Sequence, residues 1–138
     1  MKTTVEAKIQ NLPELIKLCQ QLIGDRAVKS KSYQRLLVAV EEIFVNISTY
    51  AYGDKIGTVS FEIEYIGKNR VRAEFADCGT PFNPLEFDSR QRAEDNVLKL
   101  IPGGHGIELV KLITENLSYK YENGENILSF EKSLEDEQ

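Results

Sequence analysis

The spacing of the hydrophobic residues changes near Gly53, and this change constrains the fold more than any other feature of the chain. Before Gly53, residues 12–23 and 32–52 carry apolar side chains every three or four positions, as amphipathic helices do. After it, residues 59–65 and 71–75 alternate apolar and polar side chains, which is typical of half-buried strands. The chain therefore combines helices with a sheet that has one face in water.

The remaining segments extend this pattern. Residues 3–9 alternate as a first strand, and residues 106–115 return to helical spacing. Turns are indicated at residues 67–69 and at Asn123-Gly124, the second being the strongest short hairpin signal. We predict an α+β fold, a two-layer sandwich in which a mixed, mainly antiparallel sheet carries helices on one face.

The 138 residues suffice for one domain with a single hydrophobic core. Residues 80–103 follow neither period and contain several prolines, so we expect a lid or a binding loop there, with a short helix near residues 90–100. Residues 134–138 are expected to fray. We therefore predict a single domain over residues 1–138.

The composition excludes several classes of function. A net charge of −5 disfavours nucleic acid as a partner, because phosphate binding needs a concentrated basic surface. The only histidine, His105, rules out a metal site with several histidines. Two cysteines without metal-binding spacing indicate a reducing compartment. Without an apolar run near the roughly 20 residues that a membrane span needs, we expect a cytoplasmic protein with no membrane partner.

Glu42 and Asn46 are one turn apart in an otherwise apolar helix, so they share one helix face. Such a pair often forms part of an ordinary solvated surface. It also offers a carboxylate and an amide oxygen, which suit Mg²⁺ or a bound water. The spacing leaves both interpretations open.

Asp77 continues the inward alternation of Ala73 and Phe75, which predicts a carboxylate on the buried face of the sheet. A buried charge needs a partner. Gly79, two residues later, allows a close approach to the backbone. An Asp-x-Gly sequence also forms ordinary turns, and the alternative is a carboxylate that accepts an amino group from a planar ligand.

Gly103, Gly104, His105 and Gly106 immediately precede the last predicted helix. Bare backbone N–H groups and the positive end of a helix dipole suit an anion at such a position. A flexible connection is an equally good explanation of a glycine-rich loop. His105 suits solvent as well as a phosphate.

Three segments, in this order, resemble the nucleotide-binding boxes of the GHKL ATPase superfamily: EEIFVNISTYAY, DCGTPFNP and GGHGIELV. The ending ENLSYKYENGENILSFEK is similar to that of the anti-sigma-factor serine/threonine kinases, which are similarly short. The resemblance spans roughly residues 4–134. It implies the Bergerat fold of this superfamily, with ATP and Mg²⁺ as ligands.

The resemblance also implies roles for individual residues. Glu42 matches the carboxylate that orients or deprotonates the attacking group, and Asn46 matches the Mg²⁺ ligand. Asp77 matches the aspartate that accepts a hydrogen bond from the adenine amino group. The other positions expected to bind the nucleotide are Tyr50, Gly79, Phe82, Gly103, Gly104, His105, Gly106 and Ile107.

The sequence departs from the family pattern in two places. Tyr50 stands where many relatives have a histidine, and Ile101 and Pro102 stand where kinases of the group have an arginine. Loss of that charge removes an electrostatic contribution to phosphoryl transfer, for which Arg90, Arg92 or Lys99 in the lid are candidate substitutes. Nucleotide binding is therefore better supported than phosphoryl transfer.

The resemblance implies a regulator that phosphorylates a serine or threonine on an anti-anti-sigma-type (STAS) protein and binds that protein or a sigma factor. It also implies a homodimer, which relatives often form. A second hypothesis is a non-catalytic module that holds nucleotide and sequesters its partner. A third, the catalytic half of a histidine kinase, requires an acceptor histidine on another chain.

Overall fold

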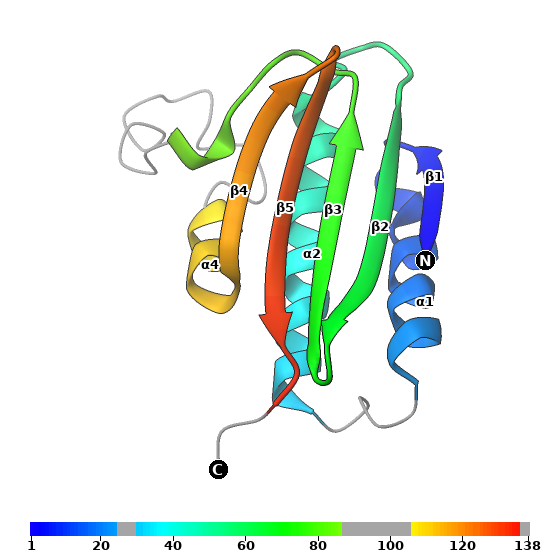
Figure 1. Cartoon of the computed structure of the whole chain (residues 1–138). Coiled ribbons are helices and arrows are strands. Elements are labelled where there is room, and N and C mark those ends of the chain that lie inside the picture. Colours follow the sequence, from blue (N-terminus) through cyan, green and yellow to red (C-terminus); the bar gives the residue numbers. More distant parts are fainter. Residues whose placement is uncertain (25–29, 87–105, 136–138) are drawn as a thin grey trace.

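The computed structural model describes residues 1–24, 30–86 and 106–135, and these form a sheet covered by helices on one face (Figure 1). The strands lie in the order β1-β2-β3-β5-β4, and every pairing between them is antiparallel. The predicted α+β sandwich is confirmed, although the sheet expected to be mixed is wholly antiparallel among the described strands. The strands are β1 (Lys2–Glu6), β2 (Thr58–Gly67), β3 (Arg70–Asp77), β4 (Glu115–Glu122) and β5 (Glu125–Ser133).

Three helices lie behind the sheet in the view of Figure 1. They are α1 (Leu12–Ile23), α2 (Lys31–Tyr50) and α4 (Gly106–Ile113). Two short 3-10 helices also occur: η1 (Ile9–Asn11) precedes α1, and η3 (Pro84–Glu86) follows β3. The long helix α2 begins after Ser30, whose hydroxyl accepts a hydrogen bond from the backbone N–H of Tyr33 at 3.3 Å. This N-cap satisfies one of the free donors of the first turn.

The core lies between the helices and the inward face of the sheet. The alternating residues of β2 and β3 point into it, and the rings of Phe61 and Phe75 pack at a tilt of 49° with centroids 4.9 Å apart. The largest side chains that are fully buried include Phe44, Phe61, Phe75 and Phe130. Burial of such side chains contributes roughly 1.5–3 kcal/mol each, so the core fixes which face of the sheet meets α2.

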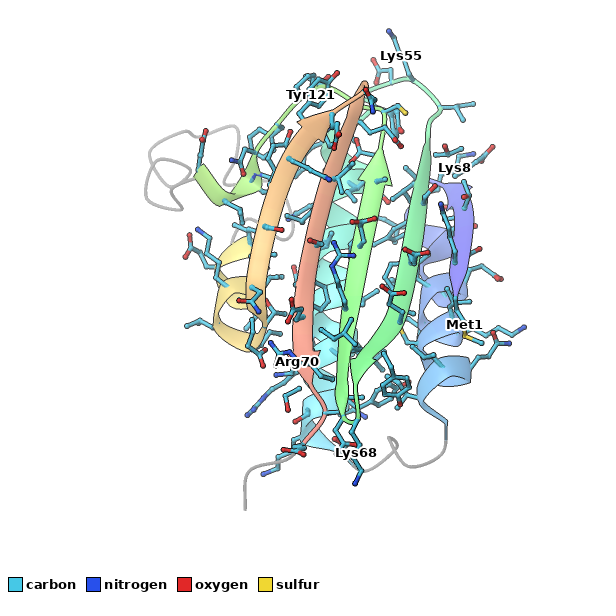
Figure 2. The ribbon with its side chains drawn as sticks, in the orientation of Figure 1. Met1, Lys8, Lys55, Lys68, Arg70 and Tyr121 are labelled. Carbon is cyan, nitrogen blue, oxygen red and sulfur yellow. The ribbon has the colours of Figure 1, made fainter. Side chains whose placement is uncertain are left out.

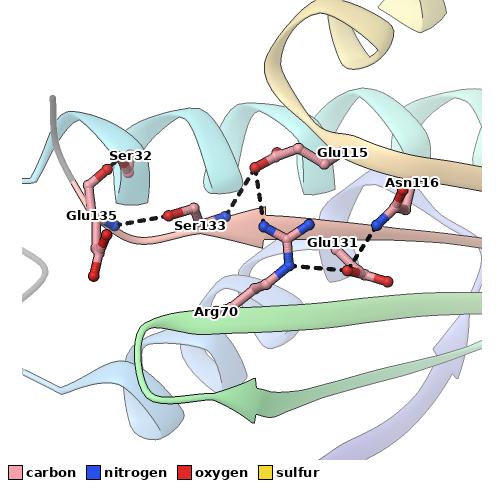
Figure 3. A network of polar contacts seen from close by, with 7 residues as sticks. All are labelled: Ser32, Arg70, Glu115, Asn116, Glu131, Ser133 and Glu135. Atoms are coloured by element: carbon pink, nitrogen blue, oxygen red, sulfur yellow. Dashed lines mark hydrogen bonds and ion pairs between the residues drawn. The ribbon is translucent and has the colours of Figure 1, made fainter.

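The opposite face of the sheet is polar and carries side chains toward the viewer in Figure 2. At one end, Arg70 donates hydrogen bonds to Glu131 at 3.0 Å and to Glu115 at 3.4 Å, while Asn116 donates to Glu131 at 3.0 Å (Figure 3). Exposed ion pairs contribute only about 0–1 kcal/mol each. Their effect here is to join β3, β4 and β5 across the open face.

The antiparallel pairing brings the end of β3 next to the start of β5. Strand β5 lies between β3 and β4, and the β4–β5 turn has Asn123 and Gly124 at φ 53° and 80°, as a tight hairpin requires. The resulting register sets Asn126 directly opposite Asp77. Two polar residues therefore meet at the edge of the hydrophobic core.

Some predicted boundaries change. The first strand, expected over residues 3–9, ends at Glu6, because the chain turns into η1 and leaves Ile9 57% exposed. Of the tail expected to fray, Leu134 is held by a 2.7 Å hydrogen bond from its N–H to Asn69, and residues 136–138 lie outside the described residues. Residues 87–103 of the expected lid also lie outside them. No helix in the described part is long and apolar enough to cross a membrane.

Candidate nucleotide site

A cavity of about 320 Å³ opens between α2, the end of β3, the β4–β5 hairpin and the start of α4. Its volume is within the range of small-molecule sites, and its walls are mainly apolar with a few polar groups. The described residues that line it are Ile43, Asn46, Ile47, Tyr50, Ala51, Asp77, Thr80, Pro81, Phe82, Pro84, Ile107, Tyr119, Asn126 and Leu128.

Asp77 is the buried carboxylate of this cavity, with 6% of its surface exposed, as the alternation of β3 predicts. Its Oδ1 accepts hydrogen bonds from the Gly79 N–H at 2.9 Å and from Asn126 Nδ2 at 3.0 Å. The Asp-x-Gly turn and the buried carboxylate are thus both present. Among the described residues, none donates a hydrogen bond to Oδ2, which leaves that oxygen able to accept one from a ligand.

Burial raises the pKa of Asp77 above its usual range, although the hydrogen bonds from Asn126 and Gly79 act in the opposite direction. The group therefore carries a desolvation cost in the ligand-free protein. A ligand that donates a hydrogen bond to the ionised carboxylate offsets part of that cost.

The segment after Asp77 is fixed to the end of α2. The Thr80 N–H donates to the Ala51 carbonyl at 2.9 Å, and the Cys78 N–H donates to the Tyr52 hydroxyl at 2.8 Å. A Cβ at Gly79 would lie 2.2 Å from the Ala51 carbonyl oxygen, so this close approach requires glycine. Tyr52, which sequence reasoning did not single out, is therefore part of the support for Asp77.

Helix α2 presents Asn46 and Tyr50 to the cavity and Glu42 at the far end of the same face. A Cβ placed on Gly106 would lie 2.3 Å from Glu42 Oε2, so this carboxylate lies against the start of α4. Burial, with a smaller contribution from Glu41, raises the pKa of Glu42. From Glu42 to Ala51 the helix rises about 13 Å, so Glu42 and the segment that carries Asp77 lie near opposite ends of this helix face.

Asn46 fits a metal ligand. Its Oδ1 is buried and has no hydrogen-bond partner among the described residues. An orphaned buried acceptor costs about 1–3 kcal/mol unless something occupies it. The described residues contain no cluster of three or more His, Cys, Asp or Glu able to hold a metal. This donor set suits Mg²⁺, which often takes one or two protein oxygens together with phosphates and water.

Of the other predicted site residues, Tyr50, Phe82 and Ile107 line the cavity, with Phe82 47% exposed. Gly106 begins α4 and contacts Glu42. The predictions for Gly103, Gly104 and His105 fall outside the described residues.

Two lining residues, Asn126 and Tyr119, were missed. The Tyr119 hydroxyl donates to Asn126 Oδ1 at 2.5 Å, which links the two strands of the last hairpin beside Asp77. Asn126 shares the inward parity of Leu128 and Phe130, so an asparagine in a buried register was the available signal.

Fold and cavity together define an α+β domain with a mainly apolar cavity that includes a buried carboxylate. The sequence matches the histidine kinase-like ATPase domain over residues 5–132, and the chain belongs to this GHKL-type family. No curated protein matches the sequence.

Two solved structures share the fold. The mycobacterial sensor histidine kinase MprB is 15% identical with a TM-score of 0.53, and the alignment covers 96% of this chain and 97% of that one. The Acinetobacter baumannii histidine kinase AdeS is 10% identical with a TM-score of 0.51, covering 97% of this chain and 68% of that one. At these identities the likeness extends to the fold alone.

Proposed function

We propose that this domain binds ATP together with Mg²⁺ in the cavity between α2 and the end of β3. The adenine occupies the apolar end, where its amino group donates to Asp77 Oδ2. Asn46 Oδ1 lies further along α2 and serves as the protein's metal ligand, and the phosphates extend toward Gly106 and Glu42. Family membership supports ATP as the ligand. The single observation that carries the proposal is the buried Asp77 with one oxygen that no described residue uses.

Calorimetric titration with ATP and with ITP, each with Mg²⁺, tests this assignment. The two nucleotides differ at purine position 6, where ATP has an amino donor and ITP an oxo acceptor. An ionised Asp77 pairs with the first and repels the second, so ATP should bind at least tenfold more tightly. Equal affinities would contradict recognition of the amino group by Asp77, and absence of binding would reject the nucleotide site.

The proposed activity is transfer of the terminal phosphoryl group of ATP to a serine or threonine hydroxyl of a partner protein. A bond forms between the hydroxyl oxygen and the terminal phosphorus, the bond to ADP breaks, and the hydroxyl proton passes to Glu42. The raised pKa of Glu42 supports this role, because a general base works best when its pKa approaches the working pH.

Glu42→Gln should remove transfer of labelled phosphate to an acceptor protein, while ATP affinity changes less than about threefold. The loss reflects the missing proton acceptor, which typically contributes 10²–10⁴-fold to rate. Glu41→Gln is the matched control, since Glu41 is the adjacent and exposed carboxylate. The control should keep transfer, with its acidic limb moved to lower pH because Glu41 raises the pKa of Glu42. Equal transfer by wild type and Glu42→Gln would exclude Glu42 as the base.

The proposed partner is an anti-anti-sigma-type (STAS) protein that carries the acceptor, or a sigma factor, with the domain acting as a cytoplasmic homodimer. The family resemblance of the sequence is the support for this part. Acid-stable label on such a partner, and binding that depends on its phosphorylation, are the expected results.

A nucleotide-binding module without transfer is the second candidate function. It is favoured by Ile101 and Pro102, which stand where kinases of the resembling group carry an arginine. Nucleotide-dependent capture of the partner without label on it would support this alternative over the kinase.

A further inference from the structure

The side-chain amide of Asn126 has five hydrogen-bond partners around the end of β3. It is 7% exposed and lies at the start of β5, opposite the end of β3. Its Nδ2 approaches three acceptors and its Oδ1 accepts from two donors. The acceptors are Asp77 Oδ1 at 3.0 Å, the Gly79 carbonyl at 3.3 Å and the Thr80 carbonyl at 3.1 Å; the donors are the Phe82 N–H at 3.1 Å and the Tyr119 hydroxyl at 2.5 Å.

These partners fix which way the amide of Asn126 points. The backbone N–H of Phe82 can only donate, so the atom that faces it is the amide oxygen. The carbonyls of Gly79 and Thr80 can only accept, so the atom that faces them is the amide nitrogen. The donor Nδ2 is therefore directed at Asp77 by the backbone, whether or not Asp77 carries a proton.

As a consequence, Oδ1 of Asp77 always accepts hydrogen bonds, and only Oδ2 can change between acceptor and donor. Two N–H groups occupy Oδ1, so a proton taken up by this carboxyl group goes to Oδ2. Protonation would turn Oδ2 from an acceptor into a donor. A 6-amino purine needs the acceptor, whereas a 6-oxo purine suits the donor.

We propose that Asn126 is a positioning residue which keeps Asp77 ionised with Oδ2 as a free acceptor, and thereby sets the preference for a 6-amino over a 6-oxo purine. This inference rests on the proposed function. Asn126 acts through Asp77 and needs no contact with the nucleotide. Through Gly79, Thr80 and Phe82 it also holds the first residues of the expected lid beside the base.

Among the described side chains around Asp77, Asn126 is the one that stabilises the ionised carboxylate. The groups facing Asp77 are the hydroxyls of Tyr52 and Tyr119 and the carboxylate of Glu125. Burial and Glu125 raise the pKa of Asp77, and among the described side chains only Asn126 lowers it. No described lysine or arginine forms an ion pair with Asp77.

The first test uses the ligand-free protein with ¹³C-labelled aspartate and follows the Asp77 carboxyl carbon by NMR as pH changes. Asn126→Ala should raise the proton affinity of Asp77 about tenfold, the usual strength of one hydrogen bond to a charged group. Asn116→Gly is the matched control. It also removes an amide bonded to a carboxylate, on the open face, and glycine tolerates the positive φ of 52° at that position. An unchanged Asp77 titration in Asn126→Ala would overturn the proposal.

A measurement on the wild-type protein decides the question if Asn126→Ala does not fold. The two Nδ2 protons of Asn126 should shift during the titration with the same midpoint as the Asp77 carboxyl carbon. Absence of this coupled titration would show that the Asn126 amide does not sense the charge of Asp77, and would overturn the proposal.

The second test measures nucleotide preference at several pH values. In Asn126→Ala the ratio of ATP to ITP affinity should fall about tenfold near the Asp77 midpoint and recover at higher pH, where Asp77 ionises without help. An unchanged ratio at every pH would contradict the inference. If wild type binds neither nucleotide, the proposed function fails, while the ligand-free titration still decides the link between Asn126 and Asp77.

Discussion

At the scale of single residues, the account depends on Asp77, a carboxylate placed where the core would otherwise be apolar. The alternation of β3 predicts its burial, and its pKa is raised because burial outweighs the two hydrogen bonds at Oδ1. The protein thus carries an electrostatic cost at the edge of this cavity. A cost of this kind is common at functional positions and rare in a core that serves packing alone.

Asp77→Asn should reverse the nucleotide preference and stabilise the ligand-free protein. Asparagine can keep the two hydrogen bonds at Oδ1 and present Nδ2 to the ligand, so ATP should bind about tenfold to a hundredfold more weakly and ITP more tightly. Calorimetry with both nucleotides measures this change. Unchanged selectivity would mean that the base lies elsewhere.

The raised pKa of Asp77 also predicts how the stability of the fold depends on pH. The folded state binds its proton on Asp77 more tightly than the unfolded chain, so this group destabilises the fold as pH rises from the unfolded pKa through the folded one. In Asp77→Asn, stability should therefore fall less between acidic and neutral pH than in wild type. Denaturant unfolding of both proteins at acidic and neutral pH checks the sign, and a larger loss in the variant would contradict the raised pKa.

At the scale of secondary-structure elements, the hydrophobic period predicts the strands and helices well. The register of β5 against β3 is a tertiary property, however, and it alone brings Asn126 to Asp77. The hydrogen bond that the Cys78 N–H donates to the Tyr52 hydroxyl is likewise not predictable from the sequence, because nothing in the sequence indicates that these two segments are in contact. Sequence reasoning therefore finds the acidic residue and misses its supports.

The contact between the end of α2 and the segment after β3 gives a further prediction. Gly79→Ala should destabilise the fold by about 2 kcal/mol and weaken ATP binding, because a Cβ there would meet the Ala51 carbonyl oxygen at 2.2 Å. Gly67→Ala is the control, since the nearest atom to its Cβ is 3.9 Å away and its stability should change by less than about 0.5 kcal/mol. Equal effects in thermal unfolding would refute the close approach at Gly79.

At the scale of the whole molecule, the sheet, α2 and α4 hold three separated sequence segments around one cavity. In the described part of the chain, the cavity is lined by the buried Asp77 and by Asn46, whose Oδ1 has no hydrogen-bond partner there, and Glu42 lies beside Gly106. The resemblance of these segments to the GHKL nucleotide-binding boxes predicts that they converge, and the fold shows which elements bring them together. Helix α2 spans the site, while β3 and α4 approach the opposite ends of one helix face.

Thermal unfolding of the whole domain with and without Mg-ATP tests the central claim most directly. A ligand that binds only the folded state at a hundred times its dissociation constant adds about 2.7 kcal/mol, which for a domain of this size raises the melting temperature by about 9 °C. We expect this rise for wild type with ATP, and a rise of only about 1–5 °C at the same ATP concentration for Asp77→Asn, because its affinity should be tenfold to a hundredfold lower. A melting temperature that ATP leaves unchanged at millimolar concentration would contradict the nucleotide site.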